Sequence, residues 1–480
     1  MLSRRKSARL LLAAALLAPA WAQLGSAPVD TAAVDTATVS KSALHKQAEL
    51  LAREALQDDL AYRLVSSLTT QVGPRLAGTP AEASARDWAV SQLRALGFSN
   101  VRVEPFELPV WVRGLERAEI VAPYPQPLVM TALGGSTATG PEGVEGRVVA
   151  FASLAALEAA PSAAVRNRIV FIDEVMTRTQ DGSGYGVATT KRRQAAYTAE
   201  GKGALAVLIR SVGTSKHRFA HTGQMRRLSG GNDRSGVPAA ALSAPDADQL
   251  QRILAEGNAV RVRIVLTPEQ RPAGMSANVI AEIPGSTAPE EIVLVGAHLD
   301  SWDLGTGAVD DGAGVGIVVA AAKRVLDAMP GGPQRTVRVV LFGAEEVGLV
   351  GAQAYAQKYA STLPQHIVAS ESDFGAGRIW RFDTGVGEKR VEAAQELGVV
   401  IRALGAGRGD NTATGGPDMT YLREAGVPVV GLKQNGWDYF DLHHTPDDTL
   451  DKIDPEDLAH NVAAWVSFIY LAANSGQYYR

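Results

Sequence analysis

The feature that most constrains the fold is an alternation of apolar, strand-length runs with helical stretches from residue 275 to the C-terminus. Short runs of valine, isoleucine and leucine are typical of buried strands, and longer amphipathic stretches are typical of helices. Their alternation favours an α/β fold, and we predict a mixed, mostly parallel sheet with helices on both faces. The expected strands are 279–283, 292–297, 337–342, 367–370 and 427–432, and the expected helices are 313–329, 347–360, 388–404 and 455–473.

Residues 125–270 differ in character, because short β runs there are separated by glycine- and serine-rich loops. This change predicts a compact, β-rich insert. His217 and His221 lie in it without a carboxylate at ligand spacing, which favours loop histidines over a metal site. The strands expected in the insert are 147–151, 168–172, 204–209 and 260–266, and the expected helix is 246–254.

The region before the insert, residues 42–124, has a helical pattern up to residue 97 and a strand pattern at 101–106. We expect this region to be the N-terminal part of the domain that residues 271–480 complete. A length of 480 residues is consistent with more than one domain.

The first 22 residues are typical of an export signal. Arg4, Arg5, Lys6 and Arg9 precede an apolar core at 10–17, and Ala20-Trp21-Ala22 matches an A-x-A cleavage site. We expect residues 1–22 to be removed and 23–41 to form a flexible leader. The mature protein would then be periplasmic or secreted and would have no membrane span. A short membrane anchor is the alternative interpretation of the same stretch.

Composition narrows the chemistry. A formal net charge of −4, without a basic motif, argues against nucleic acid as a partner. The chain has no cysteine, which excludes disulfides, a thiol nucleophile and thiolate metal ligands. Any metal must therefore be held by histidine, aspartate and glutamate.

Such residues follow successive predicted strands. In open α/β sheets ligands bind beyond the carboxyl ends of the strands, so groups placed there converge. Each group alone is weak evidence, but together they predict a metal site, because buried unpaired carboxylates are costly without a cation. The groups are His298 and Asp300, Asp310 just before a helix, Glu345 and Glu346, Asp373, and His443 and His444.

The blocks that contain these groups resemble the signatures of peptidase family M28, whose members hold two zinc ions. The blocks are His298–Gly312, Ala344–Gly348 and the stretch from His444 to Thr449. The first block is most similar to the carboxypeptidase Q branch, and Gly73–Gly78 resembles the N-terminal part of the family. The insert resembles a protease-associated domain, so the resemblance implies a zinc exopeptidase fold with such an insert.

The resemblance also implies a role for each residue. Asp310, rather than Asp311, would bridge two Zn²⁺ ions. One ion would be completed by His298 and Asp373, and the other by Glu346 and by His444 rather than His443. Glu345 would be the general base, and Asp300 would orient His298 without binding metal.

This arrangement predicts an exported exopeptidase that hydrolyses dipeptides or short peptides through a hydroxide shared by the two metals. Aminopeptidase and dipeptidase activities both remain open, and the resemblance suggests a homodimer. Two other classes stay as alternatives, a glutaminyl-cyclase-like acyltransferase and a non-catalytic receptor-like protein, although the complete ligand set disfavours both. No G-x-S-x-G elbow supports a serine hydrolase. The residues flanking the site, which either line it or only pack in loops, are Tyr421, Asn435, Trp437, Asp438 and Tyr439.

Overall fold

The computed structural model describes residues 36–226 and 236–480. The expected signal peptide, and the expected leader up to residue 35, lie outside the described residues. The last part of the expected leader is helical, because helix α1 covers Thr36–Ala55. Among the described residues, no helix combines the length and apolar character needed to cross a bilayer.

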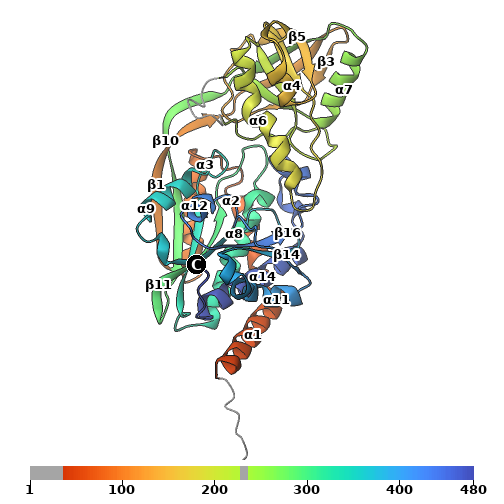
Figure 1. Cartoon of the computed structure of the whole chain (residues 1–480). Coiled ribbons are helices and arrows are strands. Elements are labelled where there is room, and N and C mark those ends of the chain that lie inside the picture. The colour runs from red at the N-terminus through yellow and green to blue at the C-terminus, as the bar shows by residue number, and fades with distance from the viewer. Residues whose placement is uncertain (1–35, 227–235) are drawn as a thin grey trace, which may run out of the picture. The chain divides into compact units, whose positions relative to one another are not determined.

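The first of two sheets has the strand order β1-β10-β12-β11-β13-β16-β14-β15. Figure 1 labels β1, β10, β11, β14 and β16 of this sheet. Its centre is parallel, from β12 through β11 and β13 to β16. Strands β1 and β10 pair antiparallel with their neighbours, and β14 is antiparallel to β16 but parallel to β15. The sheet is therefore mixed. Its strands are β1 Ser99–Val112, β10 Glu269–Ile283, β11 Ala288–His298, β12 Arg335–Phe342, β13 His366–Glu371, β14 Ile379–Gly385, β15 Gly407–Arg408 and β16 Val429–Gln434.

Helices cover both faces of this sheet because its strands are apolar on both sides. Val293 and Val295 of β11 pack in the cluster that contains helices α2, α8 and α14. Ile292 and Leu294 point the other way, into a cluster with α9 and α12. This alternation follows from the two-residue period of a strand. The helices are α2 Leu60–Gln71, α8 Ala313–Ala328, α9 Val350–Lys358, α12 Thr420–Glu424 and α14 Pro455–Asn474.

The second sheet lies entirely within residues 116–266 and has the order β3-β2-β9-β5-β6-β7-β8-β4. Strands β5 to β8 are parallel, and the outer pairs are antiparallel. Helix α6 packs in one apolar cluster and α7 in another, so this sheet is also covered on two sides. The elements are β2 Glu116–Ala122, β3 Gln126–Leu128, β4 Met130–Ala132, β5 Val144–Phe151, α4 Leu154–Ala159, α5 Ser162–Val165, β6 Arg168–Ile172, α6 Ser183–Gly201, β7 Ala206–Arg210, β8 Ala239–Leu242, α7 Ala244–Ala255 and β9 Arg261–Leu266.

One predicted helix is wrong in form. The stretch 388–404 is divided into α10, Val391–Gln395, and α11, Val399–Ala403, with a 3₁₀ turn between them. Gly398 ends that turn, and a Cβ there would lie 2.5 Å from the Phe382 ring, so the chain approaches β14 too closely for a regular amphipathic helix. The remaining helices are α3 Pro80–Ala95 and α13 Tyr439–Leu442.

Candidate metal centre

The sheet topology brings the predicted groups together. Strand β11 ends at His298, and its parallel neighbours β12 and β13 end just before Glu345 and Asp373. Because these carboxyl ends share one edge, the three side chains converge there. His444 reaches the same place from the loop after α13, and Asp310 from the turn before α8.

Asp310 lies at the middle of the cluster. Its Oδ1 is 3.1 Å from Nε2 of His298, and its Oδ2 is 3.3 Å from Nε2 of His444. His298 Nε2 is also 3.5 Å from Asp373 Oδ1, and His444 Nε2 is 2.9 Å from Glu346 Oε2. The five predicted ligands therefore form two groups that share Asp310.

The donor set fits divalent cations. Among the described residues, triplets of His, Asp and Glu donors lie within 4.8 Å of one another, and they include His443 and Asp311 beside the five predicted ligands. The triplets are Asp310 with His443 and His444, His298 with Asp311 and Asp373, and His298 with Asp310 and Glu346. Glu346 Oε1 is buried and has no hydrogen-bond donor among the described residues, which leaves it available to a cation. Burial raises the pKa of Glu346 above its ordinary value, although the charge of His444 opposes this rise. A bound cation would offset the cost of burying these carboxylates.

Asp310 and Asp311 have different surroundings, which separates their roles. The Asp311 carboxylate accepts hydrogen bonds from the backbone N–H of His298 at 3.1 Å and of Gly314 at 3.1 Å. Those bonds connect the end of β11 to the start of α8. The Asp310 carboxylate instead faces the imidazoles, so Asp310 is the better candidate for a bridging ligand.

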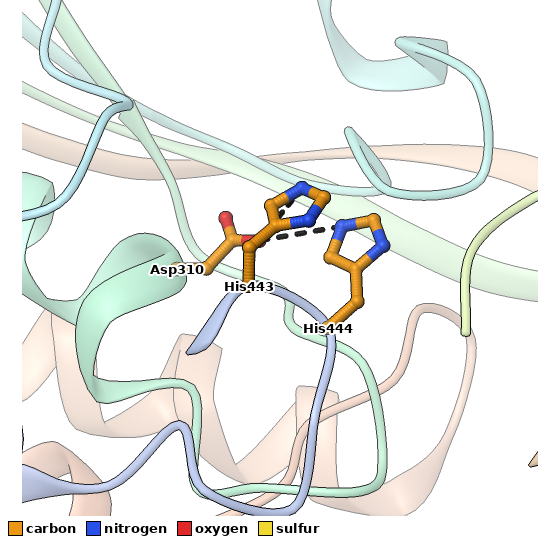
Figure 2. A group of neighbouring side chains, drawn as sticks. All are labelled: Asp310, His443 and His444. Atoms are coloured by element: carbon orange, nitrogen blue, oxygen red, sulfur yellow. Dashed lines mark ion pairs between the residues drawn. The ribbon is translucent and has the colours of Figure 1, made fainter. Parts of the chain in front are cut away.

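His443 and His444 are both close to Asp310, as Figure 2 shows. Their rings stack with centroids 3.5 Å apart. His443 Nε2 is 3.6 Å from Asp310 Oδ2, but only His444 also contacts Glu346. His444 has a φ of +61°, a strained conformation of the kind that occurs at functional sites. The geometry therefore favours His444 as the ligand.

Hydrogen bonds select the imidazole tautomers. Nδ1 of His298 lies 2.9 Å from the carbonyl oxygen of Asp300, and Nδ1 of His444 lies 3.2 Å from that of Thr222. A carbonyl only accepts, so each Nδ1 donates and each Nε2 is free to bind metal. Asp300 thus orients His298 mainly through its main chain, since its carboxylate is 3.8 Å from the ring.

The Asp300 carboxylate has a second contact that the sequence did not suggest. It accepts hydrogen bonds from the backbone N–H of Glu345 at 3.0 Å and of Glu346 at 3.3 Å. Ala344, directly before them, has a φ of +58°. Asp300 therefore positions the main chain that presents the expected base and one expected ligand.

Glu345 itself is half-buried beside the cluster. Burial raises the pKa of Glu345 well above its ordinary value, and the nearby carboxylates Asp373 and Glu346 add to the rise. A carboxylate with a raised pKa and access to the cavity can hold a transferred proton.

Comparison with known proteins agrees with this geometry. The family model described as "Peptidase family M28" matches residues 278–469. Carboxypeptidase Q of Rattus norvegicus is 33% identical over 414 residues, which are 86% of this chain and 85% of the rat protein. The chain belongs to peptidase family M28. It is therefore a metallopeptidase.

Two solved structures of similar proteins were also found. A peptidase M28 precursor from Shewanella amazonensis SB2B is 48% identical, with a TM-score of 0.88 over 92% of this chain and 99% of that chain. A zinc aminopeptidase from Bacillus subtilis is 22% identical, with a TM-score of 0.63 over 87% of this chain and 96% of that chain, and it shares the fold.

Two further residues of this M28 peptidase, Arg75 and Asp448, hold the Asp310 segment in place. Sequence reasoning gave neither of them a role. Arg75, within the Gly73–Gly78 motif, is fully buried and donates to the carbonyls of Leu299, Thr306 and Gly307. Asp448 accepts from the backbone N–H of Val309 at 2.6 Å and of Asp310 at 3.3 Å. The sequence shows an Asp in the turn after His444, but it does not show that this side chain would bind the backbone of Val309 and Asp310.

The second sheet also contributes to the metal centre of this peptidase. Thr222 donates its N–H to the carbonyl of His444 at 3.1 Å, in addition to accepting from the ring. His221, expected to be a loop histidine, is buried, and its Nδ1 lies 2.8 Å from the carbonyl of His443. Arg113, between β1 and β2, forms an ion pair with Asp303 at 2.8 Å and also donates to Thr131 and Ala132 of β4. It therefore connects the segment between Trp302 and Val309 to the second sheet.

A cavity of about 660 Å³ opens over the cluster. The segments that follow strands of the first sheet contribute Glu345 and Asp373 to its lining, and helix α6 contributes Tyr185 and Arg192. Of the five flanking residues considered from sequence, Tyr439 is among the lining residues. Trp437 is 52% exposed, and Tyr421 packs against the apolar cluster of α9 and α12.

Proposed function

We propose that this M28 peptidase is an exported di-zinc exopeptidase that hydrolyses dipeptides or short peptides, with Glu345 as general base. The observation that carries the proposal is the pair of ligand groups sharing Asp310 at the floor of a small cavity. A volume of this size suits a small ligand and excludes a folded protein.

The residues present fit two zinc ions, since zinc binds imidazole nitrogen and carboxylate oxygen in small coordination sets. His298 and Asp373 would hold one ion, Glu346 and His444 the other, and Asp310 would contact both. When bound, zinc lowers the pKa of water and polarises a substrate carbonyl.

Glu345 would take a proton at its carboxylate and return it to the leaving amine. Asp300 supports this role, because its carboxylate accepts a hydrogen bond from the Glu345 N–H. This bond fixes the main chain from which the Glu345 side chain extends. Peptide hydrolysis needs one proton removed from water and one added to nitrogen, and a single carboxyl group can do both in turn.

The arrangement of the chain belongs to the same proposal. Residues 42–124 and 271–480 would form the peptidase domain, and 125–270 a protease-associated insert that roofs the cavity. The contacts of His221 and Thr222 with the His443–His444 segment support a role for the insert in the site. Export through residues 1–22 and a homodimer complete the proposal.

The test is a panel of dipeptides, with free and blocked ends, offered to zinc-replete and zinc-depleted protein and followed by chromatography. We expect zinc-dependent release of free amino acids. A requirement for a free N-terminus together with tolerance of a blocked C-terminus would identify an aminopeptidase. Absence of hydrolysis across the panel, or conversion of N-terminal glutamine peptides to pyroglutamyl products, would contradict the proposal.

A further inference from the structure

The cavity over the metal centre has a cationic wall that the reaction described above does not use. This wall contains Arg192 and Arg193 of helix α6, and Arg226 and Lys433 also line the cavity. The acidic groups Asp310, Glu345 and Glu346 line the same cavity. A substrate in this cavity would therefore meet both this positive charge and the candidate metal centre.

Arg192 is only 5% exposed, yet no carboxylate among the described residues pairs with its charge. Its Nη2 donates to the Tyr185 hydroxyl at 2.7 Å, and the guanidinium lies 5.3 Å from the centroid of that ring. Nε and Nη1 are buried and have no hydrogen-bond acceptor among the described residues. Arginine does not lose its proton in proteins, so these donors remain a charged, unsatisfied group.

The guanidinium is held in place by its neighbours. A Cβ at Gly223 would lie 2.4 Å from Arg192 Nη1, and Gly223 has a φ of +135°, a conformation suited to glycine. The backbone of Gly223 therefore packs against the guanidinium, while the Tyr185 hydroxyl accepts a hydrogen bond from it. A fixed, planar donor of this kind matches a carboxylate better than a flexible lysine would.

Arg193 adds a second charge beside it. Across residues 36–226 and 236–480, no carboxylate lies within ion-pair distance of the Arg193 side chain. Burial lowers the pKa of Arg193, and the adjacent charge of Arg192 adds to the effect. An anion bound between the two groups would relieve both the burial cost and their repulsion.

We propose that Arg192 and Arg193 bind the free C-terminal carboxylate of the peptide substrate. The proposal rests on the peptidase function proposed above and makes that function more specific. The cavity floor holds the groups that cleave the amide, and a dipeptide places its carboxylate one residue beyond that bond. The insert would thereby measure substrate length, because a longer peptide would put its carboxylate beyond the arginines.

The experiment compares one dipeptide as the free acid and as its C-terminal amide, using zinc-replete wild-type protein and the variants R192Q, R193Q and the double variant. The readout is the ratio of kcat/KM for acid to that for amide, which does not depend on the fraction of active protein. We expect the wild type to favour the acid, and the ratio to fall roughly 10- to 100-fold in the double variant, since a hydrogen-bonded charged group is lost. R192K should recover part of the ratio.

Arg178 offers a matched control. It also belongs to the insert, but its guanidinium already pairs with Asp441 and Asp438. In R178Q the acid-to-amide ratio should equal that of the wild type. An equal fall of the ratio in R178Q would overturn the proposal, because it would show a general effect of removing positive charge.

A binding measurement gives a second readout. A dipeptide analogue with a reduced CH₂–NH bond cannot be hydrolysed, and calorimetry can compare its free acid and amide forms. We expect tighter binding of the acid by the wild type and no such preference in the double variant. Equal cleavage and equal binding of both forms by the wild type would overturn this inference alone, whereas cleavage of neither form would overturn the peptidase proposal.

Discussion

The strand ends of the first sheet and the loops of the second meet at one cavity, but they contribute different things. The first sheet supplies side chains that can bind metal or move a proton, such as His298 and Glu345. The second supplies main-chain contacts and positive charge, through Thr222 and Arg192. Reactive chemistry is thus concentrated in sequence motifs. Positioning comes partly from the same motifs, through Asp300 and Asp448, and partly from a region without such motifs.

The largest expected effect tests the reactive side of this comparison. In Glu345→Gln, kcat should fall roughly 10²- to 10⁴-fold, because the amide cannot accept the proton. Zinc content should stay that of the wild type, since Glu345 is not an expected ligand. Steady-state kinetics with zinc analysis measures both. Glu290→Gln is the control, because Glu290 belongs to a similar doublet but is exposed. Near-normal turnover in Glu345→Gln would show that Glu345 is not the general base.

The next effect concerns the end of the first sheet away from the ligand cluster, where β13 begins at His366. His366 is buried and lies 2.8 Å from the Tyr355 hydroxyl, and burial lowers its pKa to about 4. The unfolded imidazole has a pKa of about 6.5, so as the pH falls the unfolded state binds a proton before the folded state does. The protein therefore keeps its full stability above about pH 6.5 and loses part of it as the pH falls from about 6.5 to 4. The change is on the order of 3 kcal/mol.

Urea unfolding of wild type and His366→Gln at a series of pH values measures how the free energy of unfolding depends on His366. The difference in unfolding free energy should shrink as the pH falls through that window, because the wild type alone must protonate a buried imidazole. His217→Gln, at an exposed histidine, should show no comparable change. A difference that stays constant with pH would show that His366 is not held neutral by burial.

The smallest effect tests the positioning side. In His221→Ala the contact with the His443 carbonyl is lost, and zinc affinity should fall about tenfold, as for other groups that orient ligands. A competition titration with a zinc chelator measures the affinity. Lys216→Ala, on an exposed residue of the same loop, should leave it unchanged. Wild-type affinity in His221→Ala would mean that the second sheet does not position the site.

Much of the first sheet could be predicted from its sequence, because buried strands flanked by helices leave a strong apolar pattern. Helix α8, Ala313–Ala328, and helix α14, Pro455–Asn474, begin where they were expected. Strand β14 was not predicted, since Ile379–Gly385 mixes Trp, Arg and Asp with its apolar residues. Its antiparallel pairing with β16 depends on distant residues that local patterns do not report.

The second sheet was harder to predict. The expected strands at 147–151, 168–172, 204–209 and 260–266 appear as β5, β6, β7 and β9. Helix α6, Ser183–Gly201, was missed because two early glycines and a Lys-Arg-Arg run hide its apolar face. Its importance for the cavity was therefore missed as well.

For the site, the ligand types and their order along the chain could be inferred, but the contacts around them could not. The carbonyl of Thr222 orients His444, and any residue could supply a carbonyl, so no sequence signal exists. Asp300 was expected to act on His298, whereas its carboxylate mainly holds the Glu345–Glu346 main chain. Both contacts depend on the fold rather than on residue spacing.

The most direct test of the account is the zinc content of the wild-type protein and of Asp310→Asn. Asp310 is the residue that both ligand groups share, and an asparagine would not supply two anionic oxygens. Elemental analysis after dialysis should give two zinc ions per wild-type chain and at most one in Asp310→Asn. One ion or none in the wild type, or two retained in Asp310→Asn, would contradict a shared, two-metal centre.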